Sequence, residues 1–179
     1  MRRSLQLVLM LAAFAVLAGP LFAHGPTPQK VDATIAIAAP PDVVWNLVKD
    51  FAAISAWHPD VAKSEGRGGN AVGGERDVVL KSGGQLTDSL DEYVEKEMTY
   101  SYRLGKENVD AIPVSFYSAT LQVKPGADGG SEVEWLGRFY RADTGNEPPP
   151  EKNDEAAIAA MTKFLQDGLA GLKQKAETK

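Results

Sequence analysis

The residues best suited to chemistry are few, because the sequence has two histidines, His24 and His58, and no cysteine. Without cysteine there is no thiol nucleophile, disulfide, zinc ribbon or cysteine-ligated iron–sulfur cluster. His58 lies between Trp57 and Pro59, and an imidazole titrates near neutral pH, so it is a candidate acid, base or ligand contact at a pocket mouth. We favour the alternative, a histidine at a helix end that bonds a backbone carbonyl, because no serine or cysteine nucleophile motif accompanies it.

A second set of candidates lies on predicted strands. On the last strand, alternation places Trp135 on one face and Arg138 on the other. If the Arg138 face lines a cavity, its guanidinium could bind an anionic head group; if it faces solvent, Glu134 and Arg138 could form a surface pair. The sequence does not decide between these, so we assign no catalytic residue. The candidate ligand-binding residues of a cavity are Trp57, His58, Arg76, Tyr102, Tyr117, Arg138 and Tyr140.

Two weaker patterns concern metals. His24 would be the first residue of an exported chain, where its amine and imidazole could chelate copper with His58, but two histidines are few for such a site. An acidic run could supply oxygens to a hard cation, yet it has no EF-hand loop, and alternation sends Asp88 and Glu92 to one face and Asp91 to the other. A solvated edge or docking patch is favoured for this run, which comprises Asp88, Asp91, Glu92, Glu95 and Glu97. We therefore predict no metal site and no cofactor.

The N-terminus has the three regions of a secretory signal peptide. Arg2 and Arg3 precede an apolar run over residues 5–17, and a small residue, Ala23, ends the segment. A transmembrane anchor is the alternative, but a span needs about 20 apolar residues. We predict a signal peptide over residues 1–23, cleavage after Ala23, a periplasmic location and no stable membrane anchor after cleavage.

Length and charge narrow the class of protein. The chain has 179 residues, 44% hydrophobic and 24% charged, the balance of one soluble globular domain. The formal charge is −5, and loss of Arg2 and Arg3 with the leader would make it −7. Binding to nucleic acid needs a clustered basic face, so we predict no nucleic-acid partner.

The remaining pattern predicts an α+β domain over residues 31–175, between an extended arm (24–30) and a short tail (176–179). A strand over 31–38 is followed by two short helices, to about Asp50 and over residues 51–57. Glycines mark residues 65–77 as a loop or a loose hairpin between edge strands. Turn residues then separate strands at 76–80, 85–93, 98–104, 115–124 and 132–141, an antiparallel meander.

A long C-terminal helix, capped by Asn153 or Asp154 and reaching about Lys175, completes the chain. Apolar residues recur along it at three- and four-residue steps, so one face must be buried, and the sheet is its only candidate partner. The predicted stripe consists of Ile158, Met161, Leu165, Gly168 and Leu172, widened by Phe164 and Leu169.

Several segments resemble a known superfamily. Residues 39–45 (Ala-Pro-Pro-Asp-Val-Val-Trp), Trp57-His58-Pro59 and the glycine pattern over residues 72–91 are similar to START/Bet v 1-like proteins of the polyketide cyclase/dehydrase type. The resemblance implies a helix-grip fold, in which a curved antiparallel sheet wraps around the long helix. Closer similarity, over residues 24–31, 113–118, 123–126, 137–141 and 153–157, is to MxaD-type periplasmic proteins of methanol-oxidation gene clusters.

Two functional hypotheses follow. The favoured one is a non-enzymatic accessory protein, which the resemblance places beside methanol dehydrogenase or its cytochrome c acceptor, or which carries a small hydrophobic ligand. The alternative is a cavity enzyme, a cyclase or dehydratase acting on an aromatic or polyketide-like molecule. It would use His58, Arg138 and a tyrosine as acid, base and polarising groups. No readable nucleophile or cofactor motif supports the enzyme.

Overall fold

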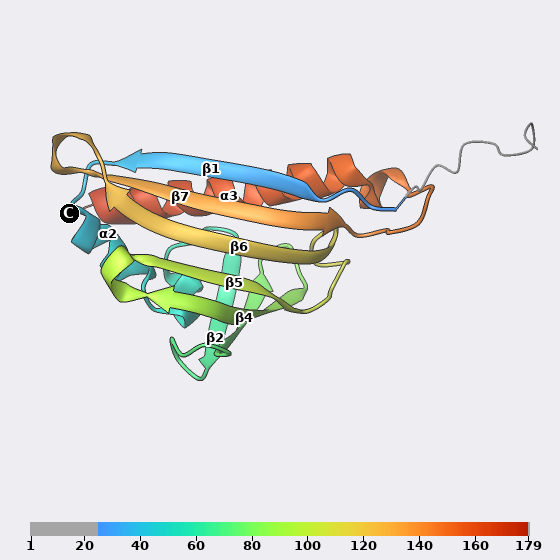
Figure 1. The fold of residues 1–179 in the computed structure, drawn as a ribbon, viewed down its shortest axis with the longest axis horizontal. Coiled ribbons are helices and arrows are strands. Elements are labelled where there is room, and N and C mark those ends of the chain that lie inside the picture. The colour runs from blue at the N-terminus through green and yellow to red at the C-terminus, as the bar shows by residue number, and fades with distance from the viewer. Residues whose placement is uncertain (1–24, 179) are drawn as a thin grey trace, which may run out of the picture.

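One antiparallel sheet and one long helix dominate the computed structural model, which describes residues 25–178 (Figure 1). The predicted signal peptide and His24 lie outside the described residues. The sheet has seven strands in the order β1-β7-β6-β5-β4-β3-β2. Their bounds are β1 (Gln29–Ile37), β2 (Val61–Arg67), β3 (Glu75–Leu80), β4 (Gln85–Val94), β5 (Thr99–Lys106), β6 (Val114–Pro125) and β7 (Ser131–Arg141).

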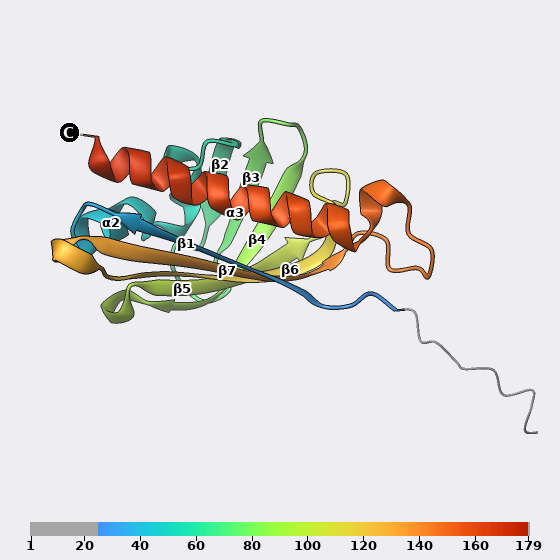
Figure 2. The same cartoon turned by 90° about the horizontal axis from the view of Figure 1, so that it is seen from above.

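In the described part of the chain the helices are two α-helices, α2 (Pro41–Val48) and α3 (Asp154–Glu177), and the short 3-10 turns η1 (Phe51–Ala56), η2 (Glu95–Glu97), η3 (Ala127–Gly129) and η4 (Pro150–Lys152). The α3 helix crosses one face of the curved sheet along its length (Figure 2). The prediction of an α+β, helix-grip architecture is therefore confirmed. Among residues 25–178, no helix is both long enough and apolar enough to cross a bilayer.

Helix α3 begins where the sequence placed its cap. The Asn153 side chain accepts a hydrogen bond of 2.9 Å from the Ala156 backbone N–H, which satisfies one free donor of the first turn. The buried stripe differs from the predicted one at its start, because Ile158 remains 38% exposed and Ala157 is buried instead. The buried row is Ala157, Met161, Leu165, Gly168, Leu169 and Leu172.

The glycine-rich segment forms an edge hairpin between β2 and β3, the second of the two predicted alternatives, with a register shift between Val61 and Lys63. Strand β2 pairs with β3 from Val61 to Arg67, although its sequence shows no apolar alternation. Val61 is its one buried residue, because β2 is the last strand of the sheet and lies mostly in solvent. Three turn glycines, Gly68, Gly69 and Gly73, have positive φ angles that other residues rarely adopt.

The arm and the first strand also differ slightly from the prediction. Strand β1 begins at Gln29, so residues 29 and 30 pair with Phe139 and Arg138 of β7 instead of forming an extended arm. This pairing makes β1 the second edge of the sheet, opposite β2. The core therefore lies between the sheet and α3, with α2 and η1 closing one end.

Candidate functional site

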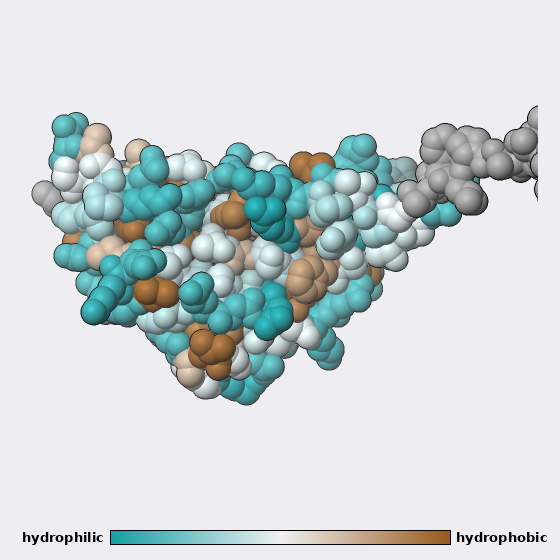
Figure 3. All heavy atoms as spheres, in the orientation of Figure 1, coloured by the Kyte–Doolittle hydropathy of each residue, from teal (hydrophilic) through white to brown (hydrophobic). Residues whose placement is uncertain are grey.

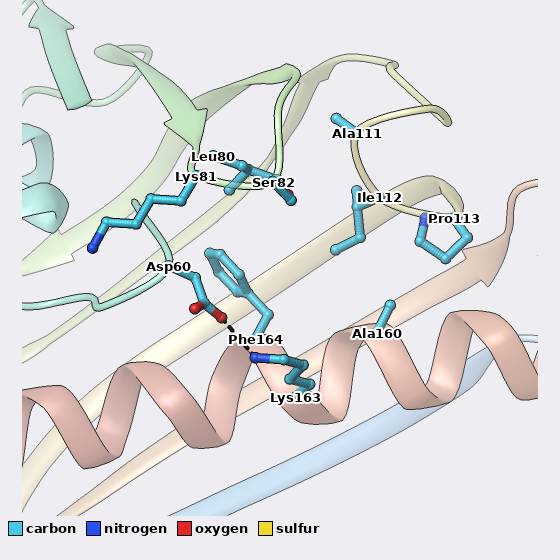
Figure 4. A pocket seen from close by; sticks show the side chains of 10 residues that line it. All are labelled: Asp60, Leu80, Lys81, Ser82, Ala111, Ile112, Pro113, Ala160, Lys163 and Phe164. Atoms are coloured by element: carbon cyan, nitrogen blue, oxygen red, sulfur yellow. Dashed lines mark hydrogen bonds and ion pairs between the residues drawn. The ribbon is translucent and has the colours of Figure 1, made fainter. Parts of the chain in front are cut away.

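A pocket of about 270 Å³ opens beside α3, between the β3–β4 turn and the loop before β6. Figure 4 shows the side chains that line it. Its walls are mostly apolar, and its rim is polar. The apolar residues are Leu80, Ala111, Ile112, Pro113, Ala160 and Phe164, and the polar ones are Asp60, Lys81, Ser82 and Lys163. Concave apolar surface with a few polar groups is typical of small-molecule sites.

The charges of the rim are mostly paired with one another. Lys163 Nζ lies 3.0 Å from Asp60 Oδ2 and also contacts the Asp167 carboxylate one turn along the helix. These bonds, with Asp167 the stronger partner, raise the pKa of the Lys163 amine. The rim cation on α3 is thus already neutralised by its own chain.

Behind the pocket lies a second, much smaller space of about 10 Å³. That volume holds at most about one water molecule. Phe164 and Ile112 line both spaces, so they form the partition between them. The other residues around the inner space are Val78, Leu86, Asp88, Tyr102, Tyr117, Met161 and Leu165. The interior that a helix-grip fold can open is therefore closed here by side chains.

A buried ion pair forms the polar end of the inner space. Arg76 Nε donates to Asp88 Oδ2 at 2.8 Å, and Arg76 Nη1 donates to the Phe51 carbonyl oxygen at 3.0 Å. The guanidinium carbon lies 4.2 Å from the ring centre of Phe51 and 4.5 Å from that of Tyr102. The Tyr117 hydroxyl donates to the other Asp88 oxygen. Each charge is thus compensated, as burial requires.

Protonation states follow from this arrangement. Burial opposes the charge on Arg76, but Asp88 outweighs it, so the pKa of the guanidinium is raised. Burial and the Asp88 charge raise the pKa of the Tyr117 hydroxyl well above its ordinary value. Tyr117 therefore stays a neutral phenol whose proton is committed to Asp88.

Tyr102 is the second buried phenol at this end. Its oxygen accepts a hydrogen bond of 3.1 Å from Trp135 Nε1, and burial raises its pKa. Among the hydrogen bonds of residues 25–178, the Tyr102 hydroxyl takes part as an acceptor only. Tyr102 is therefore a buried donor with an unused proton.

His58 is held by the backbone on both sides of its ring. Its Nδ1 accepts from the Asp60 N–H at 3.2 Å, so Nε2, 3.0 Å from the Phe164 carbonyl oxygen, is the donor. Burial lowers the pKa of His58 to about 4, although the bond to Phe164 opposes the shift. His58 is therefore neutral near pH 7 with both nitrogens engaged, as the favoured backbone-bonded alternative predicts.

Helix α3 approaches Trp57 and His58 closely because it has glycines there. A Cβ on Gly168 would lie 2.6 Å from Trp135 Cζ3 and 2.7 Å from His58 Cδ2. A Cβ on Gly171 would lie 2.4 Å from the Trp57 carbonyl oxygen. Trp57 and His58 thus pack against the helix as parts of the core. They do not line the pocket of about 270 Å³, but both border a separate open hollow of about 440 Å³ beside Gly171.

Comparison with known proteins agrees with this geometry. Residues 28–177 match the family described as polyketide cyclase/dehydrase and lipid transport. The chain belongs to this family. Among proteins with curated descriptions, none matches the chain.

Solved structures of similar fold include bacterial proteins. XoxI from Bacillus cereus is 29% identical with a TM-score of 0.69, over 82% of this chain and 94% of that one. An uncharacterised protein from Bacillus thuringiensis is 26% identical with a TM-score of 0.70, over 84% of this chain and 100% of that one. The Zhui aromatase/cyclase of Streptomyces sp. R1128 is 19% identical with a TM-score of 0.70, over 84% of this chain and 94% of that one. At 19% identity, this similarity to the aromatase/cyclase concerns the fold alone.

Arg138 and Tyr140, two of the predicted site residues, lie on the face of the sheet that is turned away from α3. Trp135 on β7 is fully buried beneath α3, so the alternate residues, Arg138 and Tyr140, are on the opposite face. Arg138 is exposed there and Tyr140 is half-buried. Figure 3 shows this face as largely hydrophilic, with scattered hydrophobic residues. The expectation that Arg138 and Tyr140 line the cavity is therefore wrong; Glu134 pairs with Lys124 rather than Arg138.

The structure also adds residues that the sequence reasoning missed. Asp88 is 2% exposed and forms the buried pair with Arg76, so it does not belong to a solvated edge. A register shift between Leu90 and Glu92 breaks the alternation on β4, which is why Asp88 and Glu92 do not share a face. The apolar neighbours of Asp88 at two-residue spacing, Leu86 and Leu90, were the available signal. Of the seven candidates, Arg76, Tyr102 and Tyr117 cluster around Asp88.

Proposed function

We propose that this protein binds a small, mostly apolar molecule in the pocket beside α3, as a carrier or sensor rather than a catalyst. The observation that carries the proposal is the pocket itself, about 270 Å³ with apolar walls and an opening to solvent. A pocket of this size is slightly smaller than those that hold drug-sized ligands, which begin at about 300 Å³. It suits a single-ring aromatic molecule or a short aliphatic chain.

The state of the polar residues supports binding rather than turnover. A general acid or base must have a proton or lone pair available to a substrate. Both ring nitrogens of His58 bond to backbone groups, and Arg76 is enclosed by Asp88 and two aromatic rings. His58 or Arg76 would have to leave these partners to serve a cyclase or dehydratase. The unused proton of Tyr102 lies in the closed inner space behind Phe164, where a substrate does not reach it in this structure.

A blocking variant tests ligand binding directly. Ala160 lines the pocket from α3, whereas the adjacent Ala159 is exposed and lies outside the pocket lining. We expect native mass spectrometry of protein isolated from its own host to show a discrete bound small molecule. The Ala160→Trp variant should lose that mass, because indole fills the pocket, while Ala159→Trp should keep it. Loss in both variants, or in neither, would contradict this location of the ligand.

We propose further that the protein acts in the periplasm in support of methanol oxidation, through contact with methanol dehydrogenase or its cytochrome c acceptor. The similarity of five segments to MxaD-type proteins and the signal-peptide pattern support this proposal. An acidic surface would favour a basic partner through steering that weakens with salt. The experiment is affinity isolation from periplasmic extract at low and high ionic strength. Recovery of either partner at low ionic strength is expected, and its absence would contradict the proposal.

A further inference from the structure

In the partition between the two spaces, the Phe164 backbone is hydrogen-bonded but its side chain is not. The Phe164 backbone carbonyl is fixed by the 3.0 Å bond to His58 Nε2. The Phe164 side chain makes ring contacts only: its centroid lies 4.1 Å from that of His58 and 5.8 Å from that of Trp135, and the residue as a whole is half-buried. In Figure 4 the ring rises from α3 between Asp60 and Ile112. Rotation of this side chain about its own bonds would join the outer pocket to the inner space.

The inner space has hydrogen-bonding capacity that the fold does not use. Each oxygen of a carboxylate can accept two hydrogen bonds. Asp88 receives one at each oxygen, from Arg76 and from Tyr117. Tyr102 contributes the unused hydroxyl proton described above. An unused donor and an unused acceptor therefore line the same buried space.

A hydroxyl group is the ligand group that fits this combination, because it both donates and accepts. A carbonyl or an ether can accept from Tyr102 but cannot donate to Asp88. A ligand amine or carboxylate would bring a charge into an apolar pocket. The rim does not compensate such a charge, since Lys163 is already paired with Asp60 and Asp167. The Lys81 side chain extends away from Ile112 and Pro113 in Figure 4.

We propose that the ligand is a neutral, mostly apolar molecule that ends in a hydroxyl group, and that Phe164 swings aside so that this hydroxyl reaches Tyr102 and Asp88. The proposal rests on the proposed ligand-binding function and names its ligand class. The apolar body occupies the pocket among Leu80, Ile112 and Ala160. Phe164 then acts as a gate, and Tyr102 and Asp88 determine specificity.

Three probes of the same shape test the ligand class: 4-butylphenol, 4-butylanisole and butylbenzene. The phenol donates and accepts, the methyl ether only accepts, and the hydrocarbon does neither. Isothermal titration calorimetry on the wild-type protein should give affinities in that order. The phenol should bind about tenfold or more tightly than the ether, because its proton reaches a charged acceptor.

Variants separate the gate from the specificity residues. Phe164→Ala should strengthen binding of all three probes, because the partition is removed, and should keep the preference for the phenol. Ile158→Ala is the matched control, since Ile158 is exposed on the same helix and does not line the pocket. Tyr102→Phe should reduce the preference for the phenol and the ether over butylbenzene. Tyr140→Phe, the same substitution on the opposite face, should change none of these ratios.

The outcomes distinguish this inference from the function on which it rests. Equal binding of the phenol and the ether, in both the wild-type and Phe164→Ala proteins, would overturn the ligand class while leaving apolar ligand binding intact. Binding of none of the three probes to either protein would contradict ligand binding in this pocket as well. Unchanged affinities in Phe164→Ala would overturn the gate.

Discussion

Arg76 on β3 and Asp88 on β4 form an ion pair in the interior, with Nε and Oδ2 2.8 Å apart and side-chain exposures of 1% and 3%. The two residues face each other directly in the register of the two strands. The rings of Phe51 and Tyr102 enclose the Arg76 guanidinium. The Tyr117 hydroxyl donates a hydrogen bond to the second oxygen of the Asp88 carboxylate. The pair therefore joins two neighbouring interior strands, β3 and β4, and reaches β5 through Tyr102 and β6 through Tyr117.

Asp88→Leu should lower the free energy of unfolding by about 3–5 kcal/mol, because Arg76 would remain buried without its counter-charge. The double variant Arg76→Met with Asp88→Leu should recover most of that loss, since two apolar side chains can pack together. Urea denaturation of Asp88→Leu, Arg76→Met and the double variant measures the coupling free energy between the two side chains.

The matched control for that cycle is Arg103→Met. It breaks the pair of Arg103 with Asp91 on β5 and β4, where the Arg103 side chain is 59% exposed. An exposed pair of this kind contributes about 0.2–1 kcal/mol. A loss in Asp88→Leu no larger than in Arg103→Met would show that the interior pair is not the structural element described here.

His58 predicts a pH dependence of stability. Its pKa is lowered by burial to about 4 in the folded protein, against 6.5 for an ordinary histidine. Between these values the unfolded chain binds a proton that the folded chain does not, so stability is complete above pH 6.5 and falls as the pH decreases towards 4. The loss over that window is about 3 kcal/mol.

Denaturation at several pH values, compared between wild type and His58→Gln, isolates this contribution from the carboxylates. The His58→Gln protein should lack the loss between pH 6.5 and 4. The His24→Gln variant, which lacks the only other histidine of the sequence, should show the same loss of stability between pH 6.5 and 4 as the wild type. A pH profile in His58→Gln that coincides in shape with that of the wild type would contradict the neutral, buried His58.

Gly168→Ala should destabilise the protein by about 1–2 kcal/mol, even though alanine favours a helix over glycine by about 1 kcal/mol. The added methyl group would meet Trp135 and His58 at less than contact distance. Ala170→Gly is the control, because Ala170 is exposed on the same helix and should show the ordinary cost of glycine. Thermal unfolding of both variants measures the difference, and stabilisation by Gly168→Ala would refute the close approach.

Much of the fold was predictable from sequence periodicity. The alternation of β6 and β7 gave correct strands because each strand has one buried face. The proline start of α2 and the Asn153 cap of α3 gave correct helix starts, because both satisfy the backbone of a first turn. Strand β2 was not predicted, since an edge strand in solvent needs no apolar alternation. Ile158 was wrongly assigned to the buried face of α3, because in the first turn the buried position is the preceding residue, Ala157.

The site was only partly predictable. Arg76, Tyr102 and Tyr117 were chosen for their polarity on strands, but nothing in a single sequence told which face of β7 met the helix. Because the Trp135 face of β7 meets α3, Arg138 and Tyr140 lie on the opposite face of the sheet, away from the pocket. Asp88 was overlooked because neighbouring acids made it look like part of a solvated run. The gate residue, Phe164, looked like ordinary core, since helical periodicity does not separate a pocket wall from a packed interior.

The most direct test of the central claim, that a small apolar molecule binds beside α3, is an NMR titration of backbone amides with 4-butylphenol. The expected result is saturable shift changes at residues 80–82, 111–112 and 160–164, which surround the pocket. Residues 138–140 of β7, which lie away from the pocket, should not change. Saturable changes confined to β7, or none at all, would contradict the account.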